Sequence, residues 1–573
     1  MPIQNSDVAE IFEKVADLLE IEGENQFRVR AYRDAARTVG GRSRSVVEMV
    51  EQDEDLSGLS GIGEDLAGKI REIVETGTLS QAEELEKETD PGLRELLGLP
   101  GLGPERVREI HERLGVSSLQ ELDEAVRNGK ISDLPGFGKK TEQNILKAIE
   151  QDRTTEKRIK ISVAEQIAES LEEFLGGIEG VNQAVVAGSY RRRQETIGDL
   201  DVVASSKKNK EVMERFVEFE DVDEVLSKGA ERTSIMLRSG LQVDLRVVPE
   251  KSFGTALFYF TGSQPHHVTL RDVSLKRDLK FNEYGLFRGD EQVAGKTEEE
   301  VYEELGFSYI EPELRENRGE LEAAKDGMLP KLITEGDIRG NLHAHTDATD
   351  GNNTTKEMAR AAKDRGYDYL AITDHSKRLR MVGGLDEKRL REQMEEVDRL
   401  NDELKGITLL KGIEVDILED GSLDLSDEIL KELDIVVCSV HHKFGLSQKE
   451  QTGRIVRAME NPYANVIAHP TGRMIGSRQP YDLDMERAME AAKETSCVLE
   501  LNADPNRLDL NDIYCKMAKE MGVKISIATD AHSISGLDNM RFGVGQARRG
   551  WLEKGDVINT RTLKQLKKLL EQG

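Results

Sequence analysis

Seven short apolar runs alternate with helical patterns through residues 338–573, and this alternation restricts the fold of the region more than any other feature of the chain. Strands that alternate with helices form parallel sheets, and seven such repeats predict a closed β/α barrel. In a barrel of this kind the functional side chains lie at the C-terminal ends of the strands. The runs end in His343 and His345, Asp374 and His375, Glu414, His441, His469, Glu500 and Asn502, and Asp530 and His532.

The side chains at these ends are typical of a metal centre. Seven of the ten histidines follow residue 340, and Asp and Glu accompany them without any Cys. Such a set suits Zn²⁺, Mn²⁺ or Fe²⁺ rather than Ca²⁺ or a structural zinc ion. Two or three close metal ions can hold the attacking and leaving oxygens of a phosphodiester. The pattern therefore predicts phosphoester hydrolysis with two or three metal ions, although any single histidine could be structural.

A second candidate centre lies in residues 185–205, VVAGSYRRRQETIGDLDVVAS. The pattern predicts a buried strand, a break at Gly188 and Ser189, a short basic helix, and a second strand that carries Asp199 and Asp201. Side chains two apart in a strand share a face, so both carboxylates point to the same side of the sheet.

A third carboxylate comes from a predicted hairpin over residues 234–248, where apolar and polar side chains alternate around a turn at Ser239-Gly240. Asp244 can then join Asp199 and Asp201. Three oxygen ligands beside the N–H groups of a strand-to-helix turn suit two Mg²⁺ or Mn²⁺ ions and a nucleotide. One such aspartate alone would be a solvated surface residue.

Residues 1–150 contain an internal repeat. The segments LSGIG at 59–63, LPGLG at 99–103 and LPGFG at 134–138 align, and an isoleucine follows seven residues after the last glycine of each. The repeat resembles the helix-hairpin-helix motif, in which a tight turn joins two helices and its N–H groups meet a DNA phosphate. Three ordinary helical turns are the alternative. The glycines expected at DNA are Gly61, Gly63, Gly101, Gly103, Gly136 and Gly138.

The composition limits the partners. At 573 residues the chain needs several domains, and its formal net charge of −30 argues against nonspecific coating of DNA. A local basic groove from residues 191–193 and 271–280 could still bind DNA with strong salt dependence. No apolar run is long enough to span a bilayer, the N-terminus lacks the pattern of a signal peptide, and the three cysteines form no disulfide pattern. We expect a cytoplasmic monomer.

The order of these features resembles DNA polymerase family X, whose best-known member is DNA polymerase beta. In that family a small helical domain and hairpins precede a GS…DxD…D palm and a YFTGS segment, which lies here at residues 259–263. The resemblance implies that Asp199, Asp201 and Asp244 are catalytic metal ligands. It also implies that the nucleotide is bound by Gly188, Ser189, Arg192 and Gly198.

The resemblance further assigns YFTGS to a thumb that presses against the incoming sugar. Tyr259, Phe260 and Gly262 would then contact the nucleotide and favour dNTPs, and Arg271 would contact the template strand. Taken alone, the two aromatic residues would be core residues. His267 stands where the family usually has Asn, and imidazole cannot both donate and accept as an amide does. We therefore expect polymerisation with altered nucleotide affinity or fidelity, through His267.

Lys69 lies where the family has its Schiff-base lysine. Such a lysine attacks the C1′ aldehyde of a 5′-deoxyribose phosphate and must be partly neutral to do so. This sequence has Asp34 and Asp65 where lysines of the eukaryotic proteins would bind the phosphate. The alternative is that Lys69 is an ordinary solvated helix residue.

The sequences HxH, TDH, E, H, HP and DAH, in this order, resemble the PHP (polymerase and histidinol phosphatase) metallophosphoesterase domain. Asn341 stands where that family often has Asp, which would weaken a partner of the histidines. By the resemblance, His343, His345, Glu414 and Asp530 would bind one metal ion, Glu414, His441 and His469 a second, and Asp350, His375 and His532 a third.

Together the resemblances cover nearly the whole chain and match the bacterial and archaeal family X polymerases with a C-terminal PHP domain. They imply a gap-filling, template-directed DNA polymerase of base excision repair that binds dNTPs and gapped or primed DNA. A 3′→5′ exonuclease is expected in the barrel, with AP-endonuclease and deoxyribose-phosphate lyase activities as further expectations. The expected parts are α-helical domains at 1–85 and 86–152 (fingers), an α/β palm at 153–250, a thumb at 251–318, a linker at 319–337 and a seven-stranded PHP barrel at 338–573.

Two other functions stay open on the sequence. A small-molecule phosphoesterase with a DNA-binding N-terminal half would hydrolyse a monoester such as histidinol phosphate and would not act on primed DNA. A DNA-binding scaffold with an inactive polymerase centre would bind gaps without consuming dNTPs.

Overall fold

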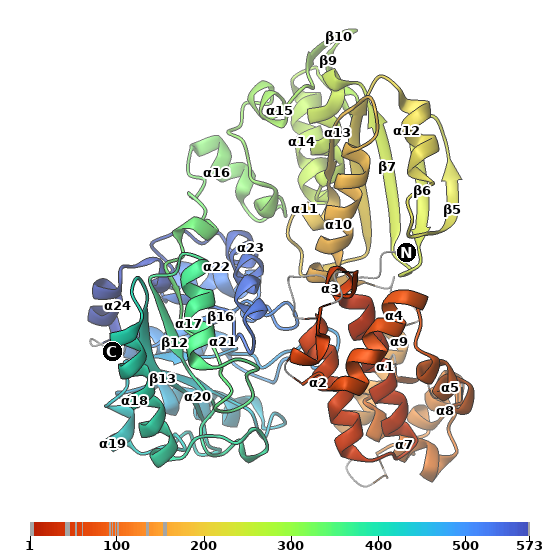
Figure 1. Ribbon diagram of the computed structural model, residues 1–573. Helices are drawn as coiled ribbons and strands as arrows, with labels where there is room; N and C mark the ends of the chain where they lie inside the picture. Colours follow the sequence, from red (N-terminus) through yellow and green to blue (C-terminus); the bar gives the residue numbers. More distant parts are fainter. Residues whose placement is uncertain are drawn as a thin grey trace.

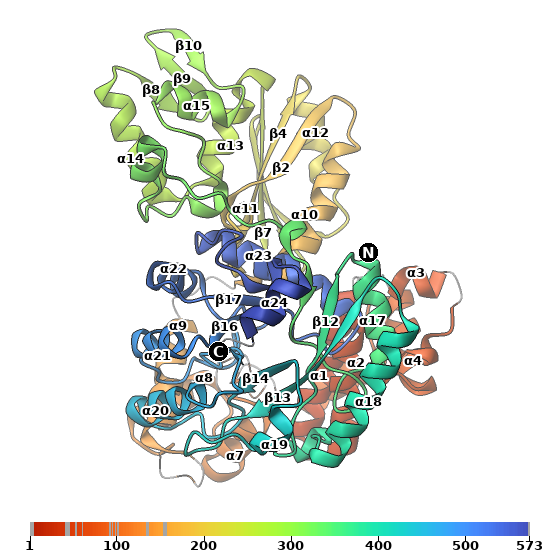
Figure 2. The same ribbon diagram turned by 90° about the vertical axis from the view of Figure 1, so that its left-hand side faces the viewer.

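The computed structural model describes the whole chain except residues 1–4, 41–45, 52–53, 60, 91–92, 94–95, 98, 100–101, 133, 135–136, 153–157 and 571–573. The palm and thumb lie above both the N-terminal helices and the barrel in Figure 1, and Figure 2 shows the same three parts from the side. None of the described helices combines the length and the apolar character that a membrane span needs.

The N-terminal helices repeat one local geometry three times, which confirms the predicted helix-hairpin-helix repeat. In each copy the first leucine of the LxGxG segment donates its backbone N–H to a residue three positions earlier, and the second glycine directly precedes a helix. The isoleucines Ile70, Ile110 and Ile145 are buried. The helices are α1 (Asn5–Ile21), α2 (Gln26–Gly40), α3 (Val46–Glu51), α4 (Glu64–Thr76), α5 (Ser80–Glu88), α7 (Pro104–Leu114), α8 (Leu119–Arg127) and α9 (Lys139–Asp152).

The palm is a five-stranded sheet in the order β2-β4-β7-β6-β5. Along β4, Leu200 and Val202 share a core with α10 and α12, whereas Val203 packs with α13 on the opposite face. Because side chains alternate, Asp199 and Asp201 point to the α13 face. The elements are β2 (Val181–Val186), α11 (Gly188–Arg191), β4 (Asp199–Ser206), β5 (Val222–Lys228), β6 (Arg232–Leu237), β7 (Gln242–Val248), α10 (Ile161–Gly176), α12 (Asn209–Phe216) and α13 (Phe253–Thr261), and β1 (Ile159–Lys160) pairs with β3 (Thr196–Ile197).

The apolar run predicted at the start of residues 185–205 forms the end of β2, an edge strand of the sheet. Val186 and Ala187 are buried, as predicted, whereas Val185 is half-buried. An edge strand has one neighbour instead of two, which leaves part of it open to solvent.

The thumb continues from α13 through α14 (Gln264–Lys276), the hairpins of β8 (Lys280–Asn282), β9 (Gly285–Arg288) and β10 (Glu291–Ala294), and α15 (Glu298–Glu304). Residues 319–337, expected to be a linker, contain α16 (Glu320–Asp326), whose Leu321 and Ala324 join the thumb core. Leu332 joins the same core, while Ile333 belongs to the barrel core. This segment therefore packs against both the thumb and the barrel.

The barrel has seven parallel strands that adjoin in chain order, as predicted. The seam between its first and last strands is bridged by a hydrogen bond of 2.9 Å from the N–H of His345 to the carbonyl of Ala531, and by Asn559, which donates to the carbonyls of Gly340 and Ile527. The strands are β11 (Gly340–Asn341), β12 (Tyr369–Ile372), β13 (Thr408–Asp416), β14 (Ile435–Ser439), β15 (Val466–Ile467), β16 (Val498–Asn502) and β17 (Ile525–Ala528).

Alternation along these strands fills the lower barrel and leaves its upper end polar. Inward side chains such as Leu410, Ile435 and Val498 form one apolar cluster, which Leu566 and Leu570 of α24 close from below. Outward side chains pack on the surrounding helices. These are α17 (Thr355–Asp364), α18 (Glu387–Glu403), α19 (Asp427–Leu430), α20 (Gln448–Met459), α21 (Met485–Thr495), α22 (Asp512–Met521) and α23 (Met540–Arg549), with α24 (Leu563–Leu570) below.

Candidate metal centres of the palm and the barrel

The three palm carboxylates lie together on the α13 face of the sheet. Parallel pairing of β4 with β7 sets Asp201 opposite Asp244, and Asp199 precedes Asp201 by two residues and therefore shares its face. Asp244 is buried, Asp201 is half-buried and Asp199 is exposed. The group thus opens from the sheet toward solvent.

The charges of this group suit a divalent cation. Burial, followed by the charges of Asp199 and Asp244, raises the pKa of Asp201 to about 7. Arg232 Nη2 lies 2.9 Å from Asp244 Oδ2 and offsets part of the negative charge. Neighbouring carboxylates that repel one another are stabilised by a shared cation, and oxygen ligands are those that Mg²⁺ prefers. The palm residues therefore fit Mg²⁺ or Mn²⁺.

The turn at Gly188 and Ser189 lies directly beside these carboxylates. A Cβ atom on Gly188, whose φ is 62°, would approach Asp201 Oδ2 to 3.2 Å, so the turn tolerates no side chain there. Ser189 Oγ is buried and has no hydrogen-bond partner among the described residues. A buried hydroxyl without a partner calls for a ligand or a water molecule. Gly198, which is half-buried, directly precedes Asp199.

Arg192 is held in a network that reaches the barrel. Its Nε lies 3.1 Å from Glu316 Oε1, and its Nη1 donates to the carbonyl of Thr261. Glu316 Oε1 also accepts a hydrogen bond of 2.9 Å from Arg549 Nη1, at the end of the barrel helix α23. The same Arg549 nitrogen donates to the carbonyl of Arg192 at 2.8 Å. The position of Arg192 therefore depends on contacts from the barrel.

The other two arginines of this segment are also paired. Arg191 Nη2 lies 2.6 Å from Glu298 Oε2. Arg193 Nη1 lies 3.0 Å from Glu165 Oε1, and Glu165 Oε2 lies 2.7 Å from Arg541 Nε of the barrel. The basic groove predicted at residues 191–193 is therefore wrong, because thumb and palm carboxylates take up these guanidinium groups.

The YFTGS segment ends α13 beside Arg192. The rings of Tyr259 and Phe260 meet edge to face with their centroids 5.1 Å apart, and Tyr259 is 37% exposed. The chain reverses at Gly262, with φ 69°, where a Cβ atom would approach Arg192 Nη1 to 3.1 Å. Arg271 is exposed on α14.

His267 lies against Tyr259, with ring centroids 4.4 Å apart. Burial, followed by the charges of Arg271 and His266, lowers the pKa of His267 to about 4, so the ring is neutral at pH 7. Its Nδ1 is buried without a partner in the described part of the chain. The neighbouring His266 has a different role, because it lies buried 2.6 Å from Glu320 and ties α14 to α16.

In the barrel, the inward faces of the strands carry the ligands at the upper end. Glu414 lies four residues after the inward Leu410 on β13, so its side chain also points into the barrel. It lies at the centre of the group of predicted ligands. Its Oε2 lies 2.6 Å from His375 Nδ1. Its Oε1 lies 3.1 Å from His469 Nε2 and 3.4 Å from His441 Nε2.

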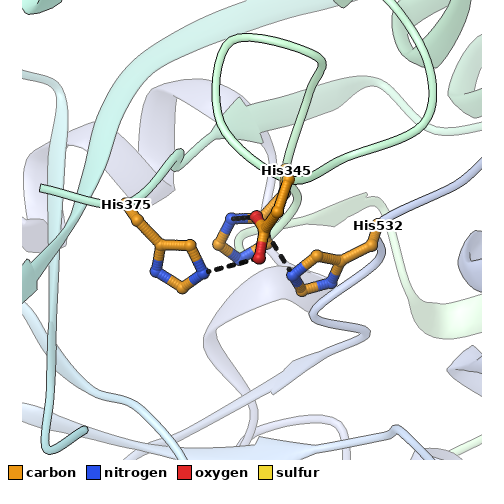
Figure 3. A group of neighbouring side chains, drawn as sticks. His345, His375 and His532 are labelled. Atoms are coloured by element: carbon orange, nitrogen blue, oxygen red, sulfur yellow. Dashed lines mark ion pairs between the residues drawn. The ribbon is translucent and has the colours of Figure 1, made fainter. Parts of the chain in front are cut away.

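Two further sets of donor atoms adjoin Glu414. His343 Nε2 and His345 Nε2 are 3.1 Å apart, and Asp530 Oδ1 lies 3.4 and 3.0 Å from them. Asp350 lies 3.9 Å from His345 Nδ1 and 3.4 Å from both His375 Nε2 and His532 Nε2, and Figure 3 shows how these three rings lie together. The structure thus brings together all nine predicted barrel ligands.

The donor atoms fit metal ions. Within the described residues, His345 Nδ1 is buried without a hydrogen-bond partner. Burial, followed by the charges of His532 and His375, lowers the pKa of His345 to about 4, and the neutral imidazole is the form that binds a metal. Buried imidazoles with carboxylates suit Zn²⁺, Mn²⁺ or Fe²⁺.

Two further carboxylates orient the rings: Glu500, which the sequence placed at a strand end without a specific role, and Asp416, which the sequence left unassigned. Glu500 Oε1 lies 2.7 Å from His343 Nδ1, and Asp416 Oδ1 lies 3.3 Å from His441 Nδ1. Carboxylates in such places fix the ring that faces the metal. Their inward positions on β16 and β13 are the signal that could have revealed them. Asn341 donates to the backbone carbonyl of His343 at 3.1 Å and also exchanges hydrogen bonds with Thr529 across the seam, so its amide helps to close the barrel.

The hairpin glycines Gly61, Gly63, Gly103 and Gly138 lie at the described turns, whereas Gly101 and Gly136 lie outside the described residues. Lys69 follows the first turn, and its Nζ lies 2.5 Å from Asp65 Oδ2 and 5.1 Å from the centre of the Tyr32 ring. Burial acts to lower the pKa of Lys69, but the hydrogen bonds to Asp65 and Tyr32 outweigh it and raise the pKa.

A full-length relative decides the family. The DNA polymerase/3′-5′ exonuclease PolX of Bacillus subtilis (strain 168) is 38% identical over 574 residues, which cover 100% of both chains. The chain belongs to the PolX family. Family descriptions match this PolX chain as a helix-hairpin-helix domain at residues 3–79, a SAM-like helix-hairpin-helix tandem at 93–151, a DNA polymerase beta thumb at 256–316 and a PHP domain at 341–502.

Two partial relatives match different parts of this chain. DNA polymerase lambda of Arabidopsis thaliana is 27% identical over 350 residues, 55% of this chain and 62% of that protein. A probable phosphatase of Thermoanaerobacter sp. (strain X514) is 32% identical over 231 residues, 38% of this chain and 89% of that protein. This PolX-family enzyme therefore joins a polymerase part to a metal-dependent phosphoesterase part.

Proposed function

We propose that the palm centre fills short gaps in DNA during base excision repair, under the direction of the template strand. Asp199 and Asp201 hold two Mg²⁺ or Mn²⁺ ions, which supply positive charge for the triphosphate. Asp244 accepts the proton of the primer 3′-OH as its oxygen bonds to the α-phosphate and pyrophosphate leaves. The pairing of Asp201 with Asp244 across β4 and β7 supports this proposal most directly, because it brings metal ligands and base to one point.

The surrounding residues position the substrates. In this proposal Gly188, Ser189, Arg192 and Gly198 bind the triphosphate, and the unpartnered hydroxyl of Ser189 is ready to donate to it. Tyr259, Phe260 and Gly262 press on the sugar and favour dNTPs, while the neutral ring of His267 meets the minor-groove edge of the base pair. Arg271 and the hairpin turns at Gly61, Gly63, Gly101, Gly103, Gly136 and Gly138 bind DNA phosphates.

We propose that the barrel centre removes nucleotides from DNA 3′ ends, and that the same centre incises at abasic sites. His343, His345, Asp530 and Glu414 would hold one metal ion. Glu414, His441 and His469 would hold a second, and Asp350, His375 and His532 a third. Zn²⁺, Mn²⁺ or Fe²⁺ ions bound there would activate water and neutralise the phosphodiester.

A gapped, 5′-phosphorylated duplex tests the whole proposal, with dNTP or rNTP and with Mg²⁺ or Mn²⁺. We expect one-nucleotide extension of the primer with dNTPs and shortening of its 3′ end when nucleotides are omitted. We also expect the active protein to be a monomer. A duplex with one abasic site tests incision. Hydrolysis of histidinol phosphate without any action on these duplexes would favour the small-molecule phosphoesterase. Binding of the gap without consumption of dNTPs would favour the inactive scaffold.

Magnesium binding to the palm is expected to depend on pH through Asp201. Because its pKa is about 7 in the folded protein, the carboxyl holds a proton below that pH, and Mg²⁺ must displace it. We expect Mg²⁺ affinity to rise up to about tenfold per pH unit from pH 5 to 7 and to level off above pH 7. For the same reason the metal-free palm loses stability as the pH rises from about 4 to 7.

Calorimetric Mg²⁺ titrations at pH 6 and pH 8 measure this dependence, with Asp201→Asn as the control that removes the titrating group. Equal palm affinities at the two pH values in the unchanged protein would contradict the prediction.

Arg549 is expected to position the nucleotide site from the barrel side. Glu316 binds the guanidinium groups of both Arg549 and Arg192. Arg549→Ala removes the first of these two ion pairs, so the carboxylate of Glu316 can shift and pull Arg192 from its place. We expect KM for dNTP to rise roughly three- to tenfold, which corresponds to about 0.7–1.4 kcal/mol, the range of a typical net hydrogen bond. Steady-state gap filling measures it. The matched control is Arg548→Ala, which also breaks an ion pair to the thumb, at Glu313, but leaves Glu316 alone. An equal KM in both variants would refute this role.

Lys69 is expected to give no lyase activity. Its raised pKa keeps the amine protonated, and a protonated amine cannot attack an aldehyde. Borohydride trapping on a 5′-deoxyribose phosphate end measures the covalent adduct, and Asp65→Asn removes the anion that holds the proton. A strong adduct in the unchanged protein that Lys69→Ala abolishes would restore the lyase interpretation.

A further inference from the structure

A basic cavity lies at the rim of the barrel, beside the metal centre. It has a volume of about 730 Å³ and is formed by the loops that follow β12, β13 and β14. Pockets of ~300–1,000 Å³ are typical of small-ligand sites, so a nucleotide-sized group can enter it. Four cationic side chains and one carboxylate line it, in a chain whose net charge is −30.

Two of these cations are available for a ligand. Lys377 and Arg378 are paired with Glu387 and Glu419 at 2.8 and 2.7 Å. By contrast, no carboxylate of the described residues lies within ion-pair distance of Arg380 or Lys443, and both side chains are exposed. They come from different loops and flank the same cavity, whose apolar wall includes Leu418 and Leu423.

The cavity is joined to the metal centre through the chain. Lys377 follows His375 by two residues, and Lys443 follows His441 by two. Asp416 connects them in space, because its Oδ1 lies 3.3 Å from His441 Nδ1 and its Oδ2 lies 3.3 Å from Arg378 Nε. A ligand whose phosphate is held by the metals would therefore extend its next unit toward this cavity.

Given the nuclease function proposed for the barrel, we infer that this rim cavity binds a nucleotide of single-stranded DNA next to the scissile phosphodiester. Arg380 and Lys443 contact the backbone phosphates, and Leu418 and Leu423 accept the apolar faces of sugar and base. The cavity thereby makes the barrel act on polynucleotides in preference to small phosphate esters. Only a substrate longer than one nucleotide has an additional phosphate for this cavity to bind, so only such a substrate gains the binding energy of that contact.

Substrates of increasing length test this inference in the full-length protein with Mn²⁺. The substrates are the p-nitrophenyl ester of thymidine 5′-monophosphate, which has no second nucleotide, and oligo-dT of 2 to 20 nucleotides. The variant is Arg380→Ala/Lys443→Ala, and the matched control is Lys388→Ala, an 85% exposed cation of α18 that does not line the cavity. Gap filling by each variant verifies that the rest of the chain is folded.

We expect the double variant to lose roughly tenfold or more in kcat/KM on the longer oligonucleotides and to keep the activity on the thymidine ester. The slope of log binding constant against log salt should fall by about 1.4, since each phosphate contact to a single strand contributes about 0.7. The control should match the unchanged protein in both.

Three results would overturn the inference. The first is a dependence of kcat/KM on oligonucleotide length that is the same in the double variant as in the unchanged protein. The second is an equal loss on ester and oligonucleotide. The third is competitive inhibition of ester hydrolysis by thymidine monophosphate that the double variant abolishes, which would make the cavity a site for free nucleotide. Failure of the proposed nuclease function itself looks different, because then the unchanged protein would not shorten oligonucleotides, or His343→Ala would still shorten them.

Discussion

Asp201→Asn is expected to lower gap filling by roughly 10³-fold or more while the barrel nuclease keeps its rate. The substitution removes the charge of a metal ligand that lies between Asp199 and Asp244, and it leaves the size and the burial of the side chain almost unchanged. Single-nucleotide extension of a primer at a one-nucleotide gap measures the loss, and shortening of single-stranded oligo-dT measures the retained activity.

The matched control for this variant is Asp223→Asn on β5, an exposed carboxylate at the edge of the same sheet. It should extend the primer at the rate of the unchanged protein. If Asp201→Asn extended the primer nearly as fast as Asp223→Asn, Asp201 would not be a ligand of the catalytic metals.

Glu414→Gln is expected to have the opposite effect, with loss of the nuclease by roughly 10³-fold and retention of gap filling. Glu414 is buried, and its two oxygens face five histidines at 2.6 to 3.6 Å, so one amide nitrogen would point at metal-binding atoms. Metal content of the purified protein should fall as well. Glu490→Gln, at an exposed carboxylate of α21, is the control and should change neither activity nor metal content. Equal metal content in Glu414→Gln and Glu490→Gln would contradict the assignment.

The architecture was predictable because it depends on patterns that repeat along the chain. Alternation of side chains in β4 and β7 was enough to predict that Asp199, Asp201 and Asp244 share a face. The barrel was predictable because six of its seven strands end in a predicted metal ligand and the seventh, β16, ends in Glu500 and Asn502, so that the order of the strands also orders these polar ends. The three hairpins were predictable from their spacing, since each isoleucine returns to the same buried position.

Contacts between distant segments were not predictable from such patterns. Residues 191–193 look like a free basic patch, yet their guanidinium groups meet Glu298, Glu316 and Glu165, which come from other elements of the fold. Likewise, the role of Asn341 depends on Thr529 lying across the barrel seam, 188 residues away. Local sequence carries the periodicity of an element, whereas these pairings depend on how the finished domains pack.

The protonation state of Lys69 was also not predictable from the sequence. Its place after the first hairpin was predictable from the motif, but the pKa of its amine depends on Asp65 and on Tyr32 from another helix. A motif therefore predicted the residue, and only the surrounding structure indicates the chemistry that the residue can perform.

In the proposed function, two separate metal centres in one chain extend and shorten the same DNA strand. A labelled primer at a one-nucleotide, 5′-phosphorylated gap, incubated with dNTP and Mn²⁺, reports both outcomes in one reaction. We predict that Asp201→Asn yields only shortened primer and that His343→Ala yields only extended primer. Loss of shortening in Asp201→Asn together with its retention in His343→Ala would contradict the claim.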